Sequence, residues 1–149
     1  MAFGSFCDTY MYMKELHAKN KGSIGELEVA SALMKLGYSV FTELGDNSKI
    51  DLIASKNNKL TTIQVKAYHS ENGAVYVPTK KSAKGYKYRY KKTDADVFAV
   101  YIYDRDSIVY IPVETLLSKK AGITIRIDPT INGQTSNINY YTDYLTMPL

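Results

Sequence analysis

The residues of this chain whose types and spacing suggest chemistry lie in two short segments, KIDLIAS (residues 49–55) and IQVKA (residues 63–67). Asp51 falls inside an apolar run that reads as a strand, where an aspartate is unfavourable. Alternation along the second segment places Gln64 and Lys66 on one face of a strand, opposite its apolar side chains. A turn role for Asp51, or a salt bridge between Asp51 and Lys66, is the purely structural alternative.

A third polar group comes from a predicted helix over residues 23–37. A helical projection gives this helix a broad apolar arc, formed by Ile24, Leu27, Val29, Ala30, Leu33, Met34 and Leu36. Glu26 falls in the middle of that arc, and a carboxylate facing the core is costly unless it is paired. The structural alternative is a capping box, in which Ser23 caps the helix and Glu26 bonds back to its start.

Hard cations such as Mg²⁺ prefer oxygen ligands, and the two segments offer several. Asp51 is the expected central ligand, joined by the backbone carbonyl of Val65 and the side chain of Gln64. Lys66 would stand beside the metal and balance charge that builds on a phosphoryl oxygen. The set therefore predicts metal-assisted hydrolysis of a phosphodiester bond.

A basic segment, KKSAKGYKYRYKK (residues 80–92), carries seven of the nineteen Lys and Arg residues and no acid. On a strand its three tyrosines would face one side and the alternating cations the other. It is either a solvated edge strand blunted by lysines or, as we favour, a phosphate-contacting surface anchored by tyrosines. The predicted DNA-binding residues are Lys80, Lys81, Lys84, Lys87, Arg89, Lys91 and Lys92.

The elements that must position these groups are a helix followed by several strands, which predicts an α/β fold with a mixed sheet. Strands are expected over residues 38–44, 49–55, 59–68, 74–77, 96–103, 107–113 and 123–127, with a short helix over 113–120. We expect one domain over residues 1–149. Within it, residues 1–21 form an irregular or weakly helical extension, and residues 121–149 form an appendage.

Composition sets the broad class. The chain has 149 residues, a formal net charge of +4 and a single cysteine, Cys7, which cannot form an internal disulfide. No apolar run is long enough for a signal peptide or a membrane span. We therefore expect an intracellular, cytoplasmic protein without a membrane partner, and the positive charge favours a polyanionic one.

The order Glu26, Asp51 and then Gln64-Val65-Lys66 resembles the PD-(D/E)XK, or restriction-endonuclease-like, nucleases. More closely, KGSIGELEVASALMKLGYSVF, KIDLIAS, IQVKA and DADVFAVYIYDRDSIVYIP are similar to the small PD-(D/E)XK endonucleases encoded in bacterial group I introns. This resemblance covers about residues 21–117. It implies a restriction-endonuclease-like core, with a central mixed β-sheet flanked by helices.

The resemblance also implies cleavage of double-stranded DNA by a homing endonuclease that uses Mg²⁺, for which Mn²⁺ can substitute. Glu26, Asp51, Gln64 and Lys66 match the catalytic positions, and Asp51, Glu26, Gln64 and Val65 the metal ligands. Gln64 replaces the usual acid, as in the QXK variants of the group, and Ile50 replaces the usual proline. A glutamine offers a carbonyl oxygen without charge, so we expect Glu26 to supply the missing negative charge.

Other functions remain open at this stage. A Holliday-junction resolvase shares the fold, a non-cleaving DNA-binding protein would keep the basic surface, and a β-rich RNA-binding module would use the tyrosines for stacking. Cutting both strands requires two active sites, so we expect a homodimer or homotetramer. The amide side chains of the tail are the candidates for base contacts: Asn132, Gln134, Asn137 and Asn139.

Overall fold

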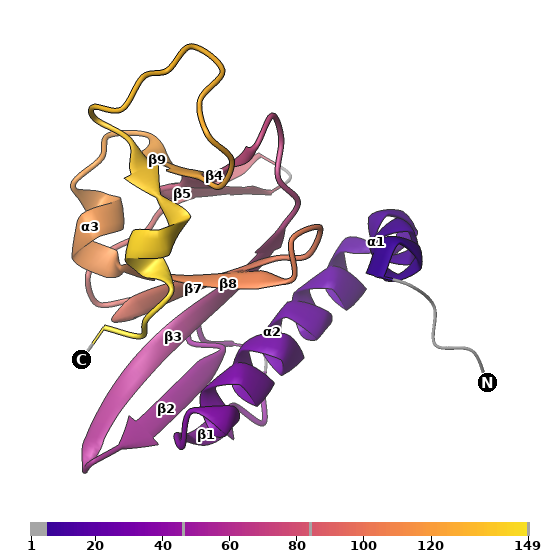
Figure 1. Cartoon of the computed structure of the whole chain (residues 1–149). Helices are drawn as coiled ribbons and strands as arrows, with labels where there is room; N and C mark the ends of the chain where they lie inside the picture. The colour runs from indigo at the N-terminus through magenta and orange to yellow at the C-terminus, as the bar shows by residue number, and fades with distance from the viewer. Residues whose placement is uncertain (1–5, 46, 84, 149) are drawn as a thin grey trace.

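The computed structural model describes residues 6–45, 47–83 and 85–148, so Lys84 of the predicted DNA-binding set lies outside the described residues. Its centre is a five-stranded sheet in the order β1-β2-β3-β7-β8 (Figure 1). The strands are β1 (Ser39–Thr42), β2 (Leu52–Lys56), β3 (Lys59–Tyr68), β7 (Val97–Ile102) and β8 (Ser107–Pro112). Strands β3 and β7 are parallel and the other neighbours antiparallel, which confirms the predicted mixed sheet.

A second layer covers one face of the central sheet. It contains a three-stranded sheet in the order β10-β9-β4 and a separate two-stranded hairpin, β5-β6. The elements of this layer are β4 (Ala74–Pro78), β5 (Lys80–Ala83), β6 (Tyr86–Arg89), α3 (Val113–Leu117), β9 (Gly122–Arg126), β10 (Asn139–Tyr140) and η1 (Tyr141–Tyr144). The basic segment predicted as one strand is therefore a hairpin.

Strand β7 packs against the second layer on one face of the sheet and against the long helix α2 on the other. Every residue of β7 is buried, because both of its faces are covered and a continuous apolar run is then favourable. Phe98 and Val100 pack into one core cluster with residues of β4 and β9, whereas Ala99 packs into another with Val29 and Leu33 of the long helix α2. The central sheet therefore separates these two core clusters.

The N-terminal part of the chain forms two helices, α1 (Phe6–Glu15) and α2 (Ala18–Lys35). The prediction was one helix over residues 23–37, preceded by an irregular or weakly helical extension. Helix α2 begins well before Ser23, and His17 caps it by accepting a hydrogen bond from the Lys19 N–H at 3.3 Å. The capping-box alternative for Glu26 is therefore wrong, because the helix already runs through Ala18, Lys19 and Lys21, which favour a helix. Gly37 follows its end with a φ of 82°, as predicted. Within the described chain, no helix is long and apolar enough to cross a membrane.

The predicted apolar arc of α2 is also partly wrong. Leu27 and Met34 are 70% and 64% exposed, and Leu36 at its end is 53% exposed. The helix instead buries Gly25, Val29 and Leu33, which recur every four residues. Gly25 permits close approach to β3, since a Cβ built there would lie 3.1 Å from the Cβ of Ala67. The contact face therefore centres on a glycine, which the hydrophobic projection did not weigh.

Candidate active site

Asp51 lies immediately before β2, not inside it as the sequence predicted, and its side chain reaches across to β3. Its own N–H donates to the Ile63 carbonyl at 2.9 Å, which continues the β2–β3 pairing by one residue. The Asp51 Oδ2 atom accepts hydrogen bonds from the Val65 N–H, at 2.6 Å, and from the Gln64 side-chain amide. The Gln64 amide nitrogen therefore holds the aspartate, and the Gln64 carbonyl oxygen is left as an uncharged ligand.

Burial raises the pKa of the Asp51 carboxyl above its ordinary value, because the charged form is poorly solvated there. The Val65 N–H, the Lys66 ammonium, the Gln64 amide and the more distant Lys81 all oppose that shift. The carboxylate thus sits in a partly buried environment whose nearest charges are positive. A bound cation would stabilise the charged carboxylate and so oppose the raised pKa.

Lys66 lies on the same face of β3 as Gln64, as the alternation predicted, and faces the second layer. Its Nζ atom lies 5.7 Å from the centre of the Tyr90 ring, within the range of a cation–π interaction. It lines a cavity of about 400 Å³ together with Tyr68, Lys80 and Lys81. The strand therefore presents its lysine to a space bordered by the basic hairpin.

Burial lowers the pKa of the Lys66 ammonium, and the positive charge of Lys81 lowers it further. The carboxylates of Asp51 and Glu26 act in the opposite direction. Two acids and two lysines thus share one electrostatic environment. Lys81 was predicted only as a DNA contact, and its charge couples to both Asp51 and Lys66.

Glu26 follows Gly25, the helical residue that approaches β3 closely. It is half-buried, and its charge is felt by Lys66. The Gly25 contact with Ala67 therefore sets the position of Glu26, because the two residues are neighbours on the same turn of α2. Glu26, Asp51, Gln64 and Lys66 converge on one region of the sheet, although they come from three separate elements.

The hairpin β5–β6 is fixed to the body by its tyrosines. Tyr90 is only 5% exposed and packs edge-on against Phe98, with ring centres 4.8 Å apart. The Tyr88 hydroxyl donates to the carboxylate of Asp94, and the Lys49 Nζ lies 3.5 Å from the centre of the Tyr88 ring. Tyr86, nearer the turn, is 63% exposed. The anchoring thus weakens from the base of the hairpin to its tip.

The cations of the hairpin fall into different environments. Lys80, Lys81, Lys87 and Lys91 are exposed. Arg89 donates to the Lys120 carbonyl at 2.8 Å, and the Lys92 ammonium lies 2.8 Å from the Glu114 carboxylate. Arg89 and Lys92 therefore already have protein partners, and the other four are better placed for an external anion.

Sequence reasoning did not place Tyr90 or Lys81 beside Lys66, although Lys81 was predicted as a DNA contact. Tyr90 and Lys81 reach the site because Thr79 and Tyr90 pair at the base of the hairpin, with the Tyr90 N–H donating to the Thr79 carbonyl at 3.0 Å. Tyr90 is one of three alternating tyrosines and Lys81 one of seven cations in the basic segment, and neither pattern separates them from neighbours that point to solvent. This convergence depends on the path of the chain between β4 and β7.

A model of the PD-(D/E)XK endonuclease family matches residues 16–147. The chain belongs to the PD-(D/E)XK endonuclease family. The match spans both core clusters and every strand of the central sheet, so the predicted resemblance and the fold class are confirmed. No curated protein matches this endonuclease family member in sequence.

Two solved structures resemble this PD-(D/E)XK family member. The bacterial homing endonuclease I-Ssp6803I matches with a TM-score of 0.69 and 22% identity, over 87% of this chain and 88% of that one. Hjc, a Holliday junction resolvase from the archaeal hyperthermophile Archaeoglobus fulgidus, matches with a TM-score of 0.49 and 17% identity, over 71% of this chain and 84% of that one. At this identity, the first likeness establishes the fold.

Proposed function

We propose that the protein is a Mg²⁺-dependent endonuclease that hydrolyses phosphodiester bonds of double-stranded DNA at a specific site, in the manner of a homing endonuclease. The observation that carries this proposal is the position of Asp51, which is held by Gln64 and Val65 and interacts electrostatically with Lys66, itself part of the lining of a cavity bordered by lysines. Membership of an endonuclease family makes a phosphodiester the expected substrate of such a site.

The donor atoms fit a hard divalent cation. Both hydrogen bonds to the Asp51 carboxylate end on Oδ2, which leaves Oδ1 for a metal, and Gln64 keeps its carbonyl oxygen. Among the described residues, no group of three or more His, Cys, Asp or Glu side chains is placed to hold a metal. This agrees with a site that has two carboxylates and one carboxamide. Asp51, Glu26, Gln64 and the Val65 carbonyl would hold Mg²⁺, and Mn²⁺ has the same ligand preference.

When bound, the metal ion would polarise the phosphoryl group and help to generate the attacking hydroxide. The residues of the chain act around it. Lys66 places a fixed positive charge where negative charge develops on the phosphoryl oxygens. Lys80 and Lys81, across the same cavity, bind the flanking phosphates and orient the strand.

The exposed lysines of the hairpin would supply phosphate contacts away from the reacting bond. If Lys87 and Lys91 each contact a phosphate, replacing both with alanine should lower the slope of log affinity against log salt concentration by about 0.9 per contact. Lys35→Ala, at an exposed position near the end of α2, is the matched control and should leave the slope unchanged. An unaltered slope in the double variant would assign these two lysines to the solvated surface.

Cleavage of both DNA strands requires two active sites, so the working enzyme is a homodimer or homotetramer in this proposal. Sedimentation of the protein with and without duplex DNA would measure the number of copies. A monomer on cleaved duplex would contradict this part of the proposal.

The deciding experiment compares cleavage of supercoiled plasmid and of a four-way DNA junction, with Mg²⁺ and with chelator. Wild type should cut duplex DNA only with the metal, and Lys66→Ala should bind DNA without cutting it. Preference for the four-way junction would contradict the homing assignment and favour junction resolution. Cutting in chelator, or equal cutting by Lys66→Ala, would contradict the proposed site.

A further inference from the structure

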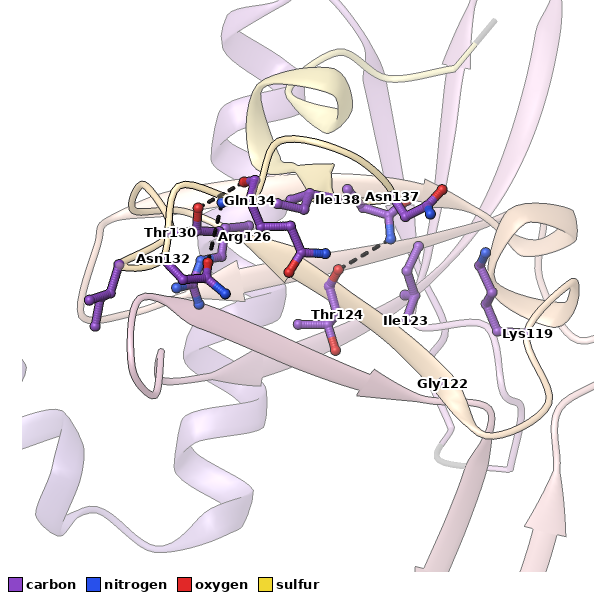
Figure 2. Close-up of a pocket in the computed structure, with 12 residues that line it drawn as sticks. Lys119, Gly122, Ile123, Thr124, Arg126, Thr130, Asn132, Gln134, Asn137 and Ile138 are labelled. Carbon is purple, nitrogen blue, oxygen red and sulfur yellow. Dashed lines mark hydrogen bonds between the residues drawn. The ribbon is translucent and has the colours of Figure 1, made fainter.

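A second cavity lies away from Lys66, between β9 and the long connection from β9 to β10. Its volume is about 600 Å³ (Figure 2). Its lining includes Lys119, Thr124, Arg126, Asn132, Gln134 and Asn137. None of the described residues that line it is acidic. Its polar groups are therefore amides, hydroxyls and two cations, a composition suited to a ligand rich in hydrogen-bond acceptors.

Arg126 carries an incomplete hydrogen-bond set at this cavity. Its Nη1 atom donates to the Asn72 carbonyl at 2.9 Å. Its Nε atom is buried and, among the described residues, has no hydrogen-bond partner. A buried donor without a partner is costly and rare, so Arg126 gains if its guanidinium turns toward acceptors of a ligand in the cavity. In that orientation the guanidinium presents two donors side by side, the fork that recognises paired acceptors.

The amide side chains of the cavity offer a second set of hydrogen-bonding groups. Gln134 donates one hydrogen bond from its side-chain nitrogen, to the Ser136 carbonyl at 3.2 Å, and an amide has a second donor hydrogen and an acceptor. Figure 2 shows Gln134 and Asn137 above Thr124, with Asn132 and Lys119 toward opposite ends of the cavity. Paired donors and acceptors of this kind match base edges, whereas a phosphate presents acceptors alone.

Shared lining residues connect this cavity to the active site. Tyr68 lines the cavity that holds Lys66 and also a middle cavity of about 360 Å³. Thr124 lines that middle cavity and also the outer one. Tyr76, on the outer face of β4 and 51% exposed, stands along the same path. The three cavities therefore adjoin one another, and a duplex engaged at Lys66 would pass Glu71 of the middle cavity on its way to Arg126.

We infer that the outer cavity is the sequence-reading surface of the enzyme, where Arg126 contacts a guanine edge and Gln134 and Asn137 contact adenine edges of the bound duplex. Arginine pairs with the O6 and N7 acceptors of guanine, and a carboxamide pairs with N6 and N7 of adenine. This inference rests on the endonuclease function proposed above. It assigns recognition to the segment after β9 and leaves cleavage to β2, β3 and α2.

The test is selection by cleavage. A library of duplexes with a randomised segment is incubated with enzyme and Mg²⁺, and the cut molecules are sequenced to give a preferred site. The enzymes compared are wild type, Arg126→Lys, Gln134→Ala and Asn137→Gly. Arg126→Lys keeps the charge and removes the fork. Asn137→Gly tolerates the φ of 59° found at that position.

Asn20→Ala removes an exposed amide from α2 and is the matched control, expected to select the wild-type site. For each cavity variant, we expect relaxed preference at one or two positions and a ratio of cleavage rates, preferred over scrambled duplex, that falls about tenfold. Thermal unfolding of each variant checks that it is folded.

An unchanged preferred site in all three cavity variants would overturn the inference. Equal losses on preferred and scrambled duplexes would also overturn it, because they would mean that the cavity adds affinity without reading sequence. A wild-type enzyme that nicks plasmid but selects no sequence would overturn base reading and leave the endonuclease proposal intact. Absence of cleavage by wild type on every duplex would overturn both.

Discussion

The two faces of β3 serve opposite purposes along the same ten residues. On one face, Ile63 is fully buried in the core with Val29 and Leu33, and Ala67 lies against Gly25 of α2. On the other face, Gln64 is bonded to Asp51, and Lys66 lines a cavity beside Tyr90. Both faces are covered, but one is packed with apolar side chains and the other with polar groups at a cavity.

This difference separates stability from chemistry. Substitutions on the helix-facing side should change the free energy of unfolding, because they remove packed atoms. Substitutions on the opposite side should change cleavage and leave the free energy of unfolding the same or higher, because a buried charged group loses favourable interactions with water.

The largest effect is expected for Lys66→Met, which keeps the length of the side chain and removes its charge. Cleavage should fall by about 100- to 1,000-fold, the usual loss when one preorganised electrostatic group is removed. The melting temperature should stay the same or rise, because burial already disfavours the ammonium. A large drop in melting temperature would mean that Lys66 contributes mainly to structure.

Ile63→Ala is the counterpart on the packed face. It should lower the free energy of unfolding by about 2–5 kcal/mol, since it leaves a cavity in a closed core. Urea unfolding measures this loss, and cleavage is assayed at a temperature where the variant is folded. A free energy of unfolding equal to that of wild type would show that Ile63 is not closely packed on this face.

The contact between α2 and β3 can be tested with two glycines of one helix. Gly22→Ala should raise the free energy of unfolding by about 1 kcal/mol, because an added Cβ meets nothing within 4 Å and alanine favours the helix. Gly25→Ala should gain less, since its Cβ would lie 3.1 Å from that of Ala67. An equal gain at both positions would show that α2 can move away from β3 without cost.

The smallest effect concerns pH and Asp51→Asn. Because burial raises the pKa of Asp51 in the fold above its ordinary value of 3.8, the folded state holds this proton more tightly than the unfolded state. The unfolding free energy of wild type should therefore fall as pH rises through the window above 3.8, relative to the variant. Urea unfolding in chelator from acidic to neutral pH would measure it, and a difference independent of pH would contradict the shift.

Local patterns predicted the strand that carries the site. The observed bounds of β3 are those expected from the run between the Asn57–Asn58 turn and Tyr68. The alternation of Gln64 and Lys66 is set by the pleat alone, so it could be read without the structure. The strand predicted from residue 49 begins three residues later, at Leu52, so Asp51 lies just before it, because an apolar run does not mark where a strand begins.

Features that depend on distant pairing could not be read in this way. The close approach of α2 requires a glycine, which adds nothing to a hydrophobic pattern, so Leu27 was wrongly placed in the core. Lys81 resembles the other lysines of its segment until the chain folds back at Thr79. The orphaned Nε of Arg126 depends on the surroundings that β9 meets in the fold.

The hydrogen bonds around Asp51 have a consequence for the order of folding. They link the two arms of one hairpin, formed by β2 and β3. The two-residue turn of this hairpin, at Asn57 and Asn58, has the positive φ values that such turns favour. Short loops close at little entropic cost, so the hydrogen bonds around Asp51 can form early in folding. The surroundings of Lys66 must wait for β7 and the hairpin to dock. The surroundings of Asp51 and of Lys66 are thus assembled at different stages of the same folding reaction.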